Sequence, residues 1–337
     1  MSKENIIAET SGLTIGYISH GRESRVMKDI SVRAHKGELV ALIGRNGSGK
    51  STLLRTLVAL QPLLEGTVWL RGRDMASISS TERPRIVSFT STEPVAARNF
   101  RVREMVALGR FPYTNWIGAL AEDDNNAIEE ALKVTGMQNL AGRRTDSISD
   151  GERQRALIAR SLAQDTGLLV MDEPTAFLDL PGRYSIVSLL RKLTREKEKC
   201  VIYSTHDLDT AINEADRIWL MTPDGISEGA PEDLMLSGTL AKAFESPLLA
   251  FSQTTGTFSF KRQKQTGISV EGTGIARKLT ERALHRAGYR TEQDALPRVI
   301  INDGKNGTEW LLIKDSSSER YNSLYELINH LPCDDLT

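Results

Sequence analysis

Two kinds of hydrophobic pattern alternate along the first 235 residues. Apolar and polar positions alternate from Ile6 to Tyr17, which is typical of strands. Later runs are continuously apolar, as in strands covered on both faces, and helical patterns separate them. The sequence therefore predicts an α/β fold built on a mainly parallel sheet. The expected apolar strands are 38–43, 168–172, 200–204 and 217–221, and the helices between them are 50–59, 151–164 and 182–196.

Beyond residues 231–252 the pattern changes to short strands with two helices. This predicts a separate small α+β domain. We place the first domain at 1–240, with a helical subdomain at about 95–165, and the second domain at 250–337. The strands expected in the second domain are 257–260, 267–270, 298–301 and 310–313, and the helices are 276–287 and 321–331.

Charge and cysteine content narrow the class of protein. Lys and Arg number 43 against 44 Asp and Glu, a balance that argues against a general nucleic-acid binder. Cys200 and Cys333 match no metal-ligand spacing and predict ordinary thiols in a reducing compartment. No apolar run is long enough to span a bilayer, and the first residues lack the apolar core typical of a signal peptide. We expect a cytoplasmic chain whose membrane role, if it has one, runs through a partner.

A glycine-rich segment from Gly44 to Ser51 fits the phosphate-loop pattern, directly after a strand and at the start of a helix. Its glycines permit a tight turn whose N–H groups converge on phosphate oxygens, and the helix dipole favours the same anion. We expect Lys50 to contact the β- and γ-phosphates and the Ser51 hydroxyl to bind Mg²⁺. The predicted nucleotide-binding residues here are Gly44, Asn46, Gly47, Ser48, Gly49, Lys50, Ser51 and Thr52.

Two adjacent carboxylates, Asp172 and Glu173, end the apolar run at 168–172. The carboxyl end of a parallel strand is where an open α/β sheet binds ligands. Asp172 is expected to hold Mg²⁺ together with Ser51, and Glu173 to polarise the water that attacks the γ-phosphate.

The segment Ser147–Arg155, about 20 residues before these carboxylates, resembles the signature of ATP-binding cassette (ABC) proteins. The resemblance covers about residues 5–235 and implies a P-loop ABC cassette with an N-terminal antiparallel β subdomain and a helical subdomain. It further implies that Ser149, Gly151 and Glu152 bind nucleotide. Tyr17 is expected to stack on adenine, Asp179 to contact the opposite subunit, and His206 to reach the γ-phosphate.

One position departs from the family. A glutamine normally follows the strand that begins near Ile86, where it ligates Mg²⁺ and senses the membrane subunit, and this segment contains none. Counting back from Val102 places Thr92 there, with Ser91 or Glu93 possible after a slip. Thr92 is expected to supply a hydroxyl to the metal.

A single cassette implies a homodimer with two ATP molecules buried between the subunits. The resemblance implies a peripheral protein at the cytoplasmic face of the bacterial inner membrane. Its partners would be a membrane-spanning permease and a substrate-binding protein. The segment Glu104–Tyr113 resembles importers of ferric siderophores, haem and vitamin B12, and its apolar, aromatic surface at Phe111, Tyr113 and Trp116 suits docking. We expect uptake of a ferric siderophore, with vitamin B12 or haem as alternatives. A soluble ABC ATPase that transports nothing, with a regulatory C-terminal domain, is the alternative of another class.

Overall fold

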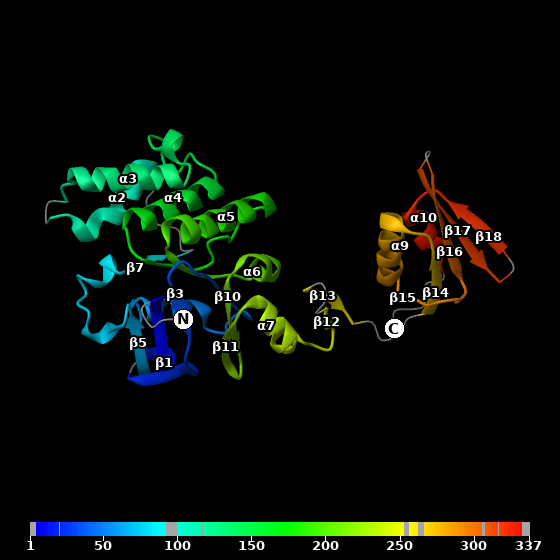
Figure 1. The fold of residues 1–337 in the computed structure, drawn as a ribbon, viewed down its shortest axis with the longest axis horizontal. Helices are drawn as coiled ribbons and strands as arrows, with labels where there is room; N and C mark the ends of the chain where they lie inside the picture. Colours follow the sequence, from blue (N-terminus) through cyan, green and yellow to red (C-terminus); the bar gives the residue numbers. More distant parts are fainter. Residues whose placement is uncertain are drawn as a thin grey trace. The chain divides into compact units, whose positions relative to one another are not determined.

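A six-stranded sheet forms the centre of the first of two units in the computed structural model (Figure 1). The first unit comprises residues 1–245 and 251–258, and the second comprises 246–250 and 259–337. The structure describes residues 5–19, 21–91, 100–115, 118–252, 256–261, 266–304, 307–315 and 317–331.

The strand order of the central sheet is β11-β10-β4-β9-β8-β7. Every pair is parallel except the edge pair β10–β11, which confirms the mainly parallel sheet predicted from the apolar runs. Strands β4, β8 and β9 are buried at every residue. The strands are β4 (Leu39–Gly44), β7 (Val87–Thr90), β8 (Leu168–Met171), β9 (Cys200–Ser204), β10 (Arg217–Thr222) and β11 (Gly225–Gly229).

Alternate residues of the buried strands enter two separate cores, one on each face of the sheet. In β4, Val40 and Leu42 pack with α1 (Lys50–Leu57) and the N-terminal strands. Leu39, Ala41 and Ile43 pack on the other face with the helices that follow β8, β9 and β11. Those helices are α5 (Leu180–Lys197), α6 (Leu208–Glu214), α7 (Pro231–Leu236) and α8 (Thr239–Phe244).

An antiparallel sheet of N-terminal strands lies against the first of these cores, as the sequence predicted. Its strand over residues 22–30 was not foreseen. Charged residues interrupt this strand without regular alternation, and most of its side chains are exposed. The strands are β1 (Ile6–Ser19), β2 (Arg22–Ile30), β3 (Arg33–His35), β5 (Glu65–Leu70) and β6 (Arg73–Asp74), followed by the 3₁₀ turns η2 (Met75–Ser77) and η3 (Arg83–Arg85).

The helical subdomain has its own hydrophobic core. A buried ion pair between Arg110 and Asp124 connects the turn at 108–113 to the helix at 122–134. The Nε of Arg110 donates to Asp124 Oδ1 at 2.8 Å, and Arg110 also donates to the carbonyl of Ala163 at 2.9 Å. Residues 108–113 form a 3₁₀ turn that follows the helix 102–107 directly. The elements are α2 (Val102–Ala107), η4 (Leu108–Tyr113), α3 (Glu122–Val134), η5 (Gln138–Leu140) and α4 (Asp150–Ala163).

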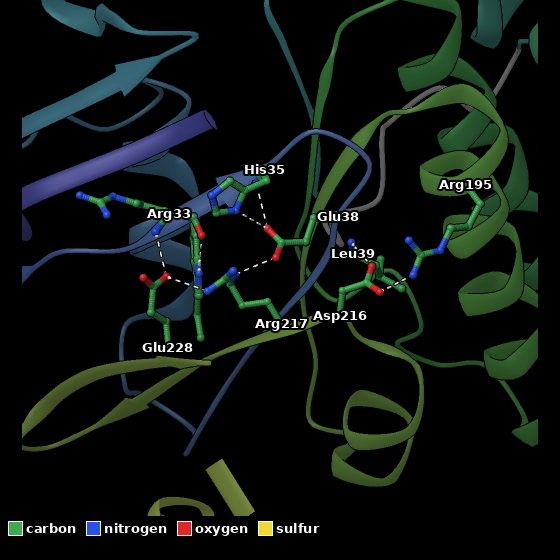
Figure 2. A network of polar contacts seen from close by, with 9 residues as sticks. Arg33, His35, Glu38, Leu39, Arg195, Asp216, Arg217 and Glu228 are labelled. Atoms are coloured by element: carbon green, nitrogen blue, oxygen red, sulfur yellow. Dashed lines mark hydrogen bonds and ion pairs between the residues drawn. The ribbon is translucent and has the colours of Figure 1, made fainter. Parts of the chain in front are cut away.

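A polar network connects residues at the amino ends of the parallel strands of the central sheet (Figure 2). Glu38 accepts hydrogen bonds from His35 and, at 2.8 Å, from Arg217 Nε. Glu228 accepts from the N–H of Arg33 at 2.9 Å, so the network joins β3, β10 and β11. Asp216 accepts from the N–H of Leu39 at 2.9 Å and pairs with Arg195, which adds α5. These charges lie at the amino ends of the strands, whereas the phosphate loop follows the carboxyl end of β4.

The second unit is a five-stranded sheet of order β15-β14-β16-β17-β18 with two helices, the α+β pattern predicted from the sequence. A hairpin of β12 (Leu249–Ser252) and β13 (Thr257–Phe260) precedes it, and Phe258 packs against Phe251 and Phe244 at ring distances of 4.8 and 5.7 Å. The last helix begins at Leu324 instead of Tyr321, because 317–321 form an edge strand. The elements are β14 (Thr266–Glu271), α9 (Gly274–Arg286), β15 (Tyr289–Thr291), β16 (Arg298–Gly304), β17 (Gly307–Lys314), β18 (Ser317–Tyr321) and α10 (Leu324–His330).

Within the described residues, no helix combines the length and the apolar character needed to cross a bilayer.

Candidate active site

The phosphate loop connects the carboxyl end of β4 to the first turn of α1. Gly47 and Gly49 have φ angles of 76° and 101°, in the region that glycine tolerates best. A Cβ on Gly49 would also lie 2.5 Å from Cγ1 of Val26, so this position excludes any side chain twice over. Backbone geometry, rather than side-chain chemistry, therefore explains the glycines of the motif.

Lys50 is buried at the start of α1 and turns back over the loop. Its ammonium donates to the carbonyls of Gly44 at 3.0 Å and Arg45 at 3.2 Å. Burial lowers the pKa of Lys50, although the negative charges of Glu173 and Asp172 act in the opposite direction. The ammonium thus binds the loop carbonyls, and the two carboxylates predicted to work with it act on its charge.

The hydroxyls that follow the loop have different environments. Ser48 Oγ is buried and has no hydrogen-bond partner among the described residues, which suits a loop that receives an anion. Ser51 is exposed at the pocket. Thr52 is buried, and its Oγ1 lies 2.8 Å from the hydroxyl of Tyr17, whose ring is half exposed.

Asp172 and Glu173 are held by a third residue, Ser204, at the end of the neighbouring strand β9. The Ser204 hydroxyl donates to Asp172 Oδ1 at 2.7 Å and accepts from the N–H of Glu173 at 2.8 Å. Glu173 itself has a φ of +47°, an uncommon conformation for this residue type. Its Oε1 lies 2.6 Å from His206 Nε2. The predicted base and the predicted switch histidine are therefore direct neighbours.

A pocket of about 420 Å³ unites most of these groups. The adenine-stacking candidate, the phosphate loop, the base candidate and the switch histidine all face it. Its lining is Tyr17, Val26, Asn46, Gly47, Gly49, Lys50, Ser51, Thr52, Glu173 and His206. Gly44 and Asp172 do not line it, but the first binds Lys50 through its carbonyl and the second binds Ser204.

Four predicted site residues lie elsewhere in the chain, at the starts of two helices. Ser149 and Glu152 form a capping box at the start of α4, with the Ser149 N–H donating to Glu152 Oε2 at 2.8 Å. A Cβ on Gly151 would meet no atom within 4 Å. Asp179 caps α5 by accepting from the N–H of Gly182 at 2.9 Å. None of the four lines the pocket described above. Thr92, the expected substitute for the missing glutamine, and its alternative Glu93 lie outside the described residues.

Two residues of the site were not assigned a role from the sequence. Ser204 carries no recognisable signal until β8 and β9 are known to be neighbours, because a serine after an apolar run is common. Val26 lies on β2, the strand that the alternation did not reveal.

The segment expected to dock a partner has an exposed phenylalanine, and its neighbouring residues are held by contacts with arginine side chains. Two guanidinium groups lie over the ring of Tyr113, with their Cζ atoms 4.0 Å (Arg110) and 5.1 Å (Arg85) from the ring centroid. Arg85 also donates to the carbonyl of Pro112 at 2.9 Å. Phe111, between these contacts, is 75% exposed. Trp116 lies outside the described residues.

A glycine loop between a buried parallel strand and a helix, facing an acidic strand end, defines a P-loop nucleoside-triphosphate hydrolase. Comparison with known proteins narrows the class. Residues 27–176 match the family described as ABC transporter, and residues 264–332 match the family described as iron ABC transporter C-terminal domain.

Individual relatives agree with these matches. The chain is 38% identical over 224 residues to the achromobactin transport ATP-binding protein of Dickeya dadantii, covering 66% of this chain and 82% of that protein. It is 34% identical over 236 residues to a siderophore transport system ATP-binding protein of Bacillus subtilis, described as probable, covering 70% and 84%. A dimeric bacterial ABC transporter cassette superposes with a TM-score of 0.59 at 25% identity, over 67% of this chain and 99% of that one.

The chain belongs to the family of ABC transporter ATP-binding subunits. It binds ATP and is an ATPase, and the resemblance and fold class predicted from the sequence are confirmed.

Proposed function

We propose that the chain is the ATP-hydrolysing subunit of an ABC importer that takes up a metal chelate, most directly a ferric siderophore. The observation that carries the hydrolytic part is the pocket in which Tyr17, the phosphate loop, Glu173 and His206 meet. In this proposal the adenine stacks on the exposed ring of Tyr17, and the phosphates bind the loop N–H groups, Lys50 and Thr52.

Glu173 is the general base for the attacking water, and His206 orients it through the 2.6 Å contact with Oε1. Ser204 fixes the backbone of Glu173 and one oxygen of Asp172, so that base and metal ligand keep a constant relation. The residues present suit Mg²⁺, which takes one or two protein oxygens together with phosphates and waters. Ser51 and Asp172 would hold it, with Thr92 as a further ligand. When bound, Mg²⁺ neutralises charge on the phosphates.

A second copy completes each site. Ser149, Gly151, Glu152 and Asp179 lie apart from the phosphate loop of their own chain, and Gly151 leaves open space at the start of α4. A two-fold dimer places these residues against the nucleotide of the opposite subunit. The dimeric cassette to which the chain is similar supports this arrangement.

Docking on a permease involves the exposed Phe111 and Leu108, whose turn is supported by the contacts of Tyr113 with Arg85 and Arg110. Through that permease the subunit is peripheral at the cytoplasmic face of the inner membrane, and a substrate-binding protein delivers the solute. The names of the siderophore-transport relatives and the iron-transporter description of residues 264–332 support the choice of solute.

The first experiment measures ATP turnover and particle size for the wild type and Glu173→Gln. Removal of a general base costs about 10²–10⁴ in turnover. We expect the variant to lose turnover and to form a dimer in ATP. The matched control is Glu232→Gln, which removes an exposed carboxylate at the start of α7. This variant is expected to keep the ATP turnover and the particle size of the wild type. If Glu173→Gln kept the turnover of the wild type, Glu173 would not be the general base.

The solute is tested on the complex with permease and binding protein in liposomes. A ferric siderophore is expected to raise ATP turnover above the level without solute, whereas haem or vitamin B12 leaves it unchanged. Stimulation by vitamin B12 or haem alone would reassign the solute. Failure of any permease to bind, with ATP turnover intact, would favour a soluble ABC ATPase instead.

A further inference from the structure

The sheet of the second unit has one covered face and one uncovered face. Val299, Ile301 and Trp310 belong to the core that both helices cover, through Leu284 of α9 and Leu327 of α10. Because side chains alternate along a strand, Ile300, Leu311 and Ile313 point to the opposite face. These three residues are outside that core, and no helix among the described residues of the unit covers them.

The pairing of the strands aligns four side chains in one row across this face. Glu271 of β14 is opposite Ile300, Ile300 is opposite Leu311, and Leu311 is opposite Arg320 of β18. The row therefore has an acidic end, an aliphatic centre and a basic end. Glu271 and Arg320 are both exposed, and Ile300 and Leu311 are partly exposed. Glu271 already pairs with Arg298 of the neighbouring strand β16 at 3.0 Å, so Arg320 of a second copy would be its second cationic partner.

Such a row is complementary to itself. When two copies of the face meet about a two-fold axis that runs along the strands between β16 and β17, the order of the row reverses in the second copy. Glu271 then faces Arg320 of the other copy, and Ile300 faces its Leu311. This reciprocal match of one patch with itself is the property of an isologous interface.

We propose that this uncovered face, centred on Ile300 and Leu311, pairs the second units of two copies of the chain. The proposal goes beyond hydrolysis, but a cassette dimer would favour it. A cassette dimer carries two second units in one complex, which raises the effective concentration of one face for the other. In turn, a face that pairs without nucleotide keeps the two cassettes close between cycles.

Sedimentation of the full-length chain without nucleotide tests the proposal, because closure of the cassettes requires ATP. We expect the wild type to be dimeric without ATP and Leu311→Asp to weaken the dimer at least tenfold. Leu279→Asp, which places the same charge on the exposed surface of α9 in the same unit, is the matched control and leaves the dimer unchanged. A monomeric wild type, or an equal effect of both substitutions, would contradict the proposal.

Charge exchange gives a second measurement that does not depend on Leu311→Asp folding. Arg320→Glu alone is expected to weaken the nucleotide-free dimer, and Arg320→Glu combined with Glu271→Arg to restore it. A double variant no stronger than the single one would overturn the assigned pairing. Addition of ATP to Glu173→Gln carrying Leu311→Asp separates the two ideas. If this double variant is a dimer with ATP and a monomer without it, the cassettes still close. The loss of the nucleotide-free dimer is then caused by the change on the sheet face.

Discussion

Ser204 connects the two acidic residues of the active site. Its hydroxyl donates to Asp172 Oδ1 and accepts from the N–H of Glu173, and it is fully buried. Both carboxylates are proposed to act on the same phosphate, one through Mg²⁺ and one through water. Their relative position therefore depends on a side chain that touches neither ligand, which makes Ser204 a positioning residue.

Ser204→Ala is expected to destabilise the fold by about 1–3 kcal/mol, because it leaves a buried carboxylate oxygen and a backbone N–H without their partner. ATP turnover should fall roughly 10- to 100-fold through misplacement of Glu173, with a smaller effect on KM. The matched control is Ser88→Ala on β7. Ser88 Oγ is equally buried but has no partner among the described residues, so its loss should leave stability unchanged or raise it by up to about 1 kcal/mol. Chemical denaturation and steady-state kinetics measure both variants, and a similar loss of turnover in both would contradict the positioning role.

Residues of the site could be predicted from sequence where spacing alone constrains them. The run from Gly44 to Ser51 is such a case, because Gly47 and Gly49 have positive φ angles, which are a local requirement of the turn. Ser204 could not be predicted, since its role exists only when β8 and β9 are adjacent. The roles assigned to Ser149, Gly151 and Glu152 stay predictions, because one chain supplies only half of the proposed site.

Among the elements, the turn η4 is attached to two helices of the helical subdomain. It is a short 3₁₀ turn, and Arg110 ties it to α3 through Asp124 and to α4 through the carbonyl of Ala163. The N–H of Ala121 and the Arg110 guanidinium hold the pKa of Asp124 below its ordinary value, against the effect of burial. Because the folded pKa is lowered, the stability that Asp124 adds is present above about pH 4 and is lost as the pH falls through the lowered pKa.

Asp124→Asn is expected to lower the free energy of unfolding by about 3 kcal/mol at pH 7, because Arg110 is left buried without its counter-charge. Asp146→Asn is the control. It removes one partner of an exposed pair with Arg144 and should cost less than about 1 kcal/mol. Urea unfolding compares them, and equal losses would show that burial of the Arg110 pair adds nothing. The turnover of Asp124→Asn should respond less to the permease, since Phe111 loses its support.

Two strands that the sequence did not reveal, β2 and β18, are highly exposed. Strand β2 has most of its side chains in solvent, and β18 is exposed at four of its five residues. Such strands need no apolar face, so periodicity does not detect them. Buried strands such as β4 and β8 were predictable because both of their faces must be apolar.

For the whole molecule, the proposed dimer explains why residues typical of a nucleotide site lie apart from the phosphate loop. Gly151 gives a direct test. An added Cβ meets nothing within 4 Å in the single chain, and Ala favours a helix over Gly. Gly151→Ala should therefore keep or slightly raise stability, by up to about 1 kcal/mol, and still lower ATP turnover through a clash with the nucleotide of the opposite subunit. Thermal unfolding and turnover are measured together. A variant with unchanged turnover would place Gly151 away from the site.

The two edges of the central sheet differ in a way that has a mechanical consequence. At the amino edge, Glu38 and Arg217 satisfy one another at 2.8 Å and are little exposed, so solvent and salt reach them poorly (Figure 2). At the carboxyl edge, the loop after β4 and the acids after β8 have groups free to meet a ligand. The ion pairs and hydrogen bonds at the amino ends of the strands resist displacement of these ends. Any movement that ATP brings about would therefore be largest at the carboxyl ends, where the nucleotide and the second subunit meet.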